Sequence, residues 1–139
     1  MPHISKNKLD NKTFFKINEQ LFKAVKYLRR EEEAAQFLSD LFTKTERLMF
    51  AKRLAIVVML EAGYPFRVIS EALKVSESTI SAMRDRFDRG GNGYRLVFAK
   101  FKREEFWQEF FKAVNSIISP KFMPSITGRG RWRKIISMR

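Results

Sequence analysis

Apolar side chains recur at three- and four-residue steps along most of the first 90 positions, which is the spacing of one face of an α-helix. A first helix is predicted over residues 14–29, with a second, shorter one after the charged run 29–33, which we expect to be a solvated junction. The inward positions of these two helices are Phe14, Ile17, Leu21, Val25 and Leu28, then Ala34, Phe37, Leu38 and Leu41. Neither a strand pattern nor an internal repeat is present, so the pattern predicts an all-α fold.

A third helix is predicted from a capping box. In the run 43–46, the Thr43 hydroxyl is expected to accept from a first-turn amide and Glu46 to reach back to the Thr43 amide. The helix should end at Ala62, with Gly63 supplying a left-handed stop. Its second half, residues 54–60, is apolar on every side and must therefore be covered. A chain of 139 residues has few other elements that could surround this helix. We therefore expect a second subunit to pack against it, and hence a homodimer.

Residues 65–88 have the arrangement of a helix-turn-helix, two short helices joined by a tight turn. Pro65 fits the first turn of the leading helix, and Ser76 is the expected N-cap of the next. Ser70 is small where the helices cross, and Val75 fills the space between them. The second helix is expected to turn Ile80, Met83 and Phe87 inward.

The opposite face of that second helix is polar. Short polar side chains near a helix N-terminus are of the kind that a DNA major groove accommodates. The predicted base-reading residues are Glu77, Ser78, Thr79, Ser81 and Arg84, with Asp85 on the same face, and the predicted DNA-backbone contacts here are Arg67, Lys74 and Ser76. The alternative is an ordinary helical hairpin in a protein core. Such a hairpin does not require an N-cap at Ser76, a space-filling Val75 and a polar face in combination.

The C-terminal third differs in composition. Residues 90–93 are expected to be a glycine-rich flexible linker, since they lack the spacing of a phosphate-binding loop. An amphipathic helical extension is expected over 94–119, with its strongest apolar pattern at Phe106, Trp107, Phe110, Phe111, Val114, Ile117 and Ile118. Residues 120–139 hold six Lys and Arg and no acid, and they predict a flexible basic tail, as residues 1–13 predict a flexible N-terminus. Phosphate contacts are expected from Arg129, Arg131, Arg133 and Lys134, beside Trp132; a tail that merely aids solubility is the alternative.

Charge and composition narrow the class of partner. The net charge is +13, of which +8 lies in residues 90–139, and such a charge favours a polyanion. Cysteine is absent and His3 is the one histidine, which excludes thiolate metal sites and most zinc and histidine-based catalytic sites. We therefore predict no enzyme activity, catalytic residue, metal or cofactor. The longest apolar run is seven residues against the twenty or so that span a bilayer, so a cytoplasmic protein is expected.

Four short motifs together resemble the tryptophan-repressor family, and its YerC/YecD branch in particular. They are residues 41–47, residues 53–57, Gly63 and residues 73–81, and the resemblance covers about residues 15–88. It implies an all-helical, intertwined homodimer whose paired reading helices enter successive major grooves of duplex DNA.

The resemblance has two departures. The family usually has glycine in the turn, where this chain has Lys74; a left-handed lysine costs about 1 kcal/mol, which predicts a slightly different turn. Arg53 matches the first of two arginines that clamp the tryptophan indole, but Ala82 stands at the second position. Arg84 lies about 200° further around the helix and does not replace it. Arg53 is therefore the one candidate for binding a small ligand. The alternative is that Arg53 is a structural charge or faces phosphate. Tryptophan is not the expected corepressor.

The sequence thus predicts a sequence-specific regulator of transcription, a repressor that binds double-stranded DNA as a homodimer. An RNA- or ribosome-associated protein that binds through the basic C-terminal segment is the main alternative. A third interpretation is the DNA-targeting fragment of a recombination enzyme, because insertion-element transposases use similar helix-turn-helix units.

Overall fold

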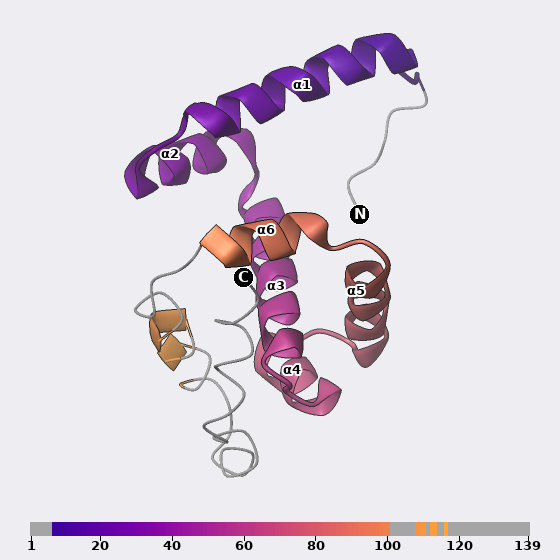
Figure 1. Ribbon diagram of the computed structural model, residues 1–139, viewed down its shortest axis with the longest axis vertical. Helices are drawn as coiled ribbons and strands as arrows, with labels where there is room; N and C mark the ends of the chain where they lie inside the picture. Colours follow the sequence, from indigo (N-terminus) through magenta and orange to yellow (C-terminus); the bar gives the residue numbers. More distant parts are fainter. Residues whose placement is uncertain (1–6, 101–107, 111, 114–115, 117–139) are drawn as a thin grey trace. The chain divides into compact units, whose positions relative to one another are not determined.

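The computed structural model describes residues 7–100, 108–110, 112–113 and 116, and every regular element among them is an α-helix (Figure 1). This confirms the all-α fold class for the described part of the chain. The helices are α1 (Asn11–Tyr27), α2 (Glu31–Leu41), α3 (Lys44–Glu61), α4 (Phe66–Leu73), α5 (Glu77–Arg89) and α6 (Asn92–Lys100). Contacts divide the chain into two compact units, with the division between Arg47 and Leu48.

Helix α1 begins earlier than the apolar pattern predicts. Asp10 is its N-cap, and the Thr13 amide donates to the Asp10 carboxylate at 2.7 Å. This hydrogen bond favours the ionised form and lowers the pKa of Asp10. The boundary expected at residue 14 is therefore wrong: residues 11–13 are helical, although their polar side chains add nothing to the hydrophobic period.

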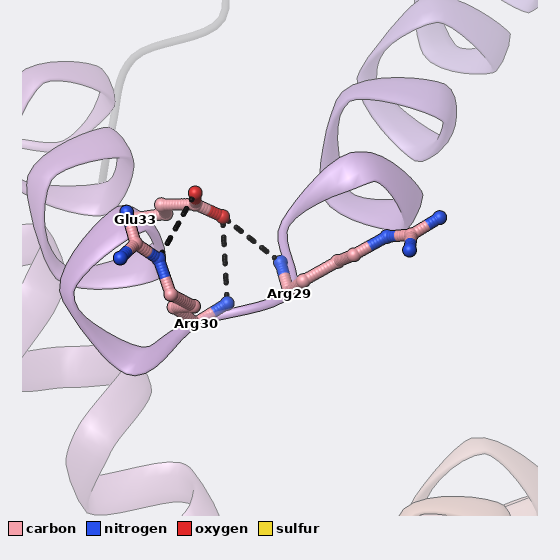
Figure 2. Close-up of polar contacts among 3 residues, drawn as sticks. All are labelled: Arg29, Arg30 and Glu33. Atoms are coloured by element: carbon pink, nitrogen blue, oxygen red, sulfur yellow. Dashed lines mark hydrogen bonds and ion pairs between the residues drawn. The ribbon is translucent and has the colours of Figure 1, made fainter.

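The junction between α1 and α2 is held by one carboxylate (Figure 2). Glu33 accepts from the backbone amides of Arg29 at 3.1 Å and Arg30 at 3.4 Å, and from the Arg30 side chain at 3.4 Å. These bonds lower the pKa of Glu33, the Arg29 amide most of all. The charged run is exposed, as expected, but it also forms a hydrogen-bonded start for α2.

Neither α1 nor α2 contains a buried residue. The apolar stripe of α1 is exposed, and its most exposed members are Phe14, Phe15, Ile17, Phe22 and Val25. We call these five side chains the α1 apolar face. Helix α1 is thus amphipathic as predicted, and its apolar side is exposed in the described part of the chain.

The core of the second unit forms around α3. Residues 56–60 of α3 are buried together with Val68 and Ile69 of α4, Ile80 and Phe87 of α5, and Phe98 of α6. These helices of the same chain cover most of the apolar stretch 54–60, and only Leu54 is exposed. The expectation that a second subunit must cover this stretch is therefore wrong.

The expected linker at 90–93 is also shorter than predicted. Asn92 and Gly93 form the first turn of α6, and only Gly90 and Gly91 separate α5 from α6. Gly91 has φ +64°, and a Cβ there would lie 2.5 Å from the Phe87 carbonyl oxygen, so the tight corner requires glycine. The helical core consequently extends past residue 89.

Part of the expected C-terminal helix is described. Residues 108–110, 112–113 and 116 are helical, and the half-buried Phe110 packs against the core of the second unit. The other apolar positions of that helix lie outside the described residues, as do residues 1–6 and the whole of 120–139.

Candidate nucleic-acid interface

The turn between α4 and α5 is built on Ser70 and Lys74. Lys74 has φ 54° and ψ 52°, the left-handed region, and its amide donates to the Ser70 carbonyl oxygen. The Val75 amide donates to the same oxygen at 3.3 Å, and the Ser70 hydroxyl donates to the Val75 carbonyl at 2.6 Å. Lysine thus adopts the left-handed conformation that the family's glycine would supply. Ser70 stabilises the turn through both its carbonyl oxygen and its hydroxyl.

Ser76 caps α5, as predicted. Its hydroxyl oxygen accepts from the Thr79 amide at 3.2 Å. The same hydroxyl lies 3.0 Å from the Ser78 hydroxyl and 2.8 Å from the Thr79 hydroxyl. Three exposed hydroxyls therefore form one local network at the start of the helix.

The two faces of α5 differ as the pattern predicts. Ile80 and Phe87 are buried and Met83 is half-buried. On the other side, the structure brings together four exposed candidates from the first five residues of the helix: Glu77, Ser78, Thr79 and Ser81. Arg84 follows one turn later, half-buried, with its Nε 3.1 Å from the Asp88 carboxylate. These positions suit base reading, and that role remains a prediction.

The candidates for DNA-backbone contact are exposed on α4 and on the turn that follows it. Lys74 and Ser76 lie between α4 and α5, whereas Arg67 is on α4 with its Nε 3.4 Å from the Glu71 carboxylate. Helices α4 and α5 pack against each other, so the described candidates share one supersecondary unit. The predicted contacts at Arg129, Arg131, Arg133 and Lys134 lie outside the described residues.

Arg53 lies on a small cavity. Its guanidinium is 5.4 Å from the centre of the Phe50 ring. The cavity holds about 200 Å³, and its lining consists of Arg53, Met83, Arg86, Phe87, Gly91 and Tyr94. Neither Ala82 nor Arg84 lines it. The second guanidinium on this cavity is that of Arg86.

The comparisons with known proteins decide the family. The model of the Trp repressor protein family matches residues 17–102, which is more than half of the chain and includes α4, α5 and α6. The chain belongs to the Trp repressor family. It is also 30% identical over 87 residues to the "Uncharacterized protein YerC" of Bacillus subtilis (strain 168), an alignment that covers 63% of this chain and 84% of that protein. No solved structure matches the chain.

Trp repressor proteins are DNA-binding regulators with a helix-turn-helix, and α4 and α5 form that unit here. Among the described helices none is long and apolar enough to cross a membrane. In the same part of the chain, no group of three or more side chains is arranged to hold a metal ion.

The contacts of two arginines in this Trp repressor-family chain were not predicted from the sequence. Arg86 lines the cavity together with Gly91, which precedes α6, and Tyr94 of α6, and α6 begins in the stretch expected to be a linker. Arg95 of α6 donates to the carbonyls of Gly90 at 2.5 Å and Phe87 at 3.3 Å, and its guanidinium lies 4.5 Å from the centre of the Phe87 ring. Arg95 therefore ties α6 to the end of α5. Its spacing in the sequence carries no signal of that contact.

Proposed function

We propose that this chain is a sequence-specific regulator of transcription, a repressor, that binds duplex DNA as a homodimer through α4 and α5. The observation that carries the proposal is the first half of α5, where exposed polar side chains stand on a helix anchored by Ile80 and Phe87. Membership of the Trp repressor family supports the same assignment.

The proposed contacts follow from exposure and chemistry. Glu77, Ser78, Thr79, Ser81 and Arg84 are assigned to base edges in the major groove, because they are the polar side chains among the first eight residues of α5 and four of them are exposed. Arg67, Lys74 and Ser76 are assigned to phosphates, which fix the protein on the duplex without reading its sequence. Four tail residues outside the described part, Arg129, Arg131, Arg133 and Lys134, are assigned to phosphates on charge alone.

A second copy of the chain is the proposed cover for the α1 apolar face. Phe15 and Phe22 are 70% and 63% exposed, and Leu48 at the start of the second unit is 56% exposed. Large apolar patches on a soluble protein usually mark an interface. A homodimer places two α5 helices on one duplex, which suits a site made of two half-sites.

Ser81→Ala tests the reading face. Fluorescence anisotropy should show that it weakens binding to the preferred duplex by about 1–3 kcal/mol and leaves random duplex unchanged, because only a base contact is lost. Ser116→Ala is a matched control, since the Ser116 hydroxyl is exposed and, among the described residues, donates to the Ala113 carbonyl. Equal weakening on both duplexes would mean that this face does not read bases.

A further inference from the structure

The polar side chains on the outward side of α5 are not equally available. The hydroxyls of Ser78 and Thr79 both lie within hydrogen-bond distance of the Ser76 hydroxyl, and Arg84 is paired with Asp88. For Glu77 and Ser81, the described residues provide no side-chain hydrogen bond or ion pair. Two of the five base-reading candidates therefore keep their full hydrogen-bonding capacity for a partner.

Glu77 is the more selective of these two. Its carboxylate is exposed at the first position of α5, one helical turn before Ser81 on the same side. A carboxylate only accepts hydrogen bonds, whereas a serine hydroxyl both donates and accepts. On a chain with net charge +13, a free carboxylate on the DNA-facing side opposes phosphate binding. This repulsion is compensated only where a base donates a hydrogen bond to the carboxylate.

In the major groove, the cytosine N4 amino group is the donor that Glu and Asp side chains recognise. We infer that Glu77 is a specificity-determining residue which accepts a hydrogen bond from a cytosine amino group in each half-site. Thymine at that position presents an oxygen acceptor, so the carboxylate loses its partner and faces another negative group. Glu77 thereby selects sites largely by penalising the wrong ones. The inference rests on the proposed DNA-binding function.

Glu77→Gln tests this with full-length protein. Sites selected from random duplexes by the unaltered protein should carry cytosine at one fixed position of each half-site. Replacing that cytosine by thymine should weaken binding roughly 5- to 150-fold. With Glu77→Gln the cytosine preference should disappear and adenine should be favoured, because a glutamine amide matches the adenine edge. Binding to random duplex should tighten, since a carboxylate that faces phosphates is gone.

Glu31→Gln is the matched control. Glu31 is the exposed first residue of α2, as Glu77 is of α5, so the substitution removes the same charge from the same helical position. Its ratio of preferred to random binding should equal that of the unaltered protein.

The possible outcomes distinguish failure of the inference about Glu77 from failure of the proposed DNA-binding function. If Glu77→Gln lowers the melting temperature but keeps the cytosine preference, Glu77 only stabilises the first turn of α5 and the inference fails alone. Selected sites without a fixed cytosine would also overturn it while leaving DNA binding intact. If the unaltered protein selects no sequence at all, the proposed function fails and the inference with it.

Discussion

At the scale of single residues, Lys74 combines a backbone cost with a useful charge. It is the one non-glycine residue with positive φ in the described part of the chain. The left-handed conformation costs an L-residue about 1 kcal/mol, and glycine would remove that cost. We expect the ammonium group of Lys74, at this exposed corner of the helix-turn-helix, to contact a DNA phosphate.

Lys74→Gly should separate stability from binding. Its free energy of unfolding should rise by about 1 kcal/mol as the strain is relieved. Its DNA affinity should fall on all sequences alike, and the slope of log affinity against log salt should flatten by about 0.9, the loss of one phosphate contact. Urea unfolding and salt-titrated anisotropy measure the two effects.

Lys74→Gln is the control, because it removes the charge and keeps the strain. It should show the same loss of affinity without the gain in stability. If Lys74→Gly leaves the salt slope unchanged, Lys74 does not contact phosphate.

At the scale of helices and turns, the start of α3 is a predicted capping box that the structure confirms. The Thr43 amide donates to the Glu46 carboxylate at 2.8 Å, and the Glu46 amide donates to the Thr43 hydroxyl at 3.2 Å. The bond from the Thr43 amide, followed by that from its hydroxyl, lowers the pKa of Glu46. The ionised carboxylate therefore holds the first turn of α3.

This cap predicts an acid-dependent contribution to stability. Since the pKa of Glu46 is lower in the folded state, its contribution is present above the ordinary value near 4.5 and is lost as the pH falls through the folded value. Glu46→Gln should lower the melting temperature at pH 7, and the difference from the unaltered protein should shrink towards pH 3. A difference that stays constant with pH would contradict the role of the carboxylate.

The helix-turn-helix was predictable because its signals are local. Pro65 begins one helix, Ser76 caps the next, and the spacing of Ile80 and Phe87 sets the buried side of α5. The start of α6 was placed in a linker because residues 90–93 are three glycines and an asparagine, which is also the composition of a linker. Arg86 and Arg95 could not be found without α6, since their contacts form only when Tyr94, Gly90 and Gly91 are placed in space.

At the scale of the whole molecule, α1 carries the exposed apolar face that is proposed to meet a second chain. The periodicity of α1 gave its apolar stripe correctly, but a period does not say whether the same chain or another covers that stripe. The uniformly apolar run in α3 predicted a subunit contact there instead, yet Ile56 and Val57 are 1% and 0% exposed in the single chain. Val57→Asp would therefore test the fold of one chain, and substitutions on α1 test assembly.

The basic tail is expected to add affinity without sequence preference. If Arg129, Arg131, Arg133 and Lys134 each meet a phosphate, deletion of residues 120–139 should flatten the salt slope on duplex DNA by about 3–4. Discrimination between target and random duplex should barely change, because α5 is intact. Loss of all binding on deletion, with a strong effect of Trp132→Ala on single-stranded RNA, would favour the RNA-binding alternative.

Selection of genomic duplexes by the full-length protein, followed by light scattering of the complex on the selected site, tests the central claim most directly. The account predicts a site with two-fold symmetry, with half-sites one helical turn or a multiple apart, bound by two chains. The substitution Phe22→Glu on α1 should reduce the complex to one chain and weaken it strongly. A selected pool with no common sequence, or one chain bound to an asymmetric site, would contradict the account.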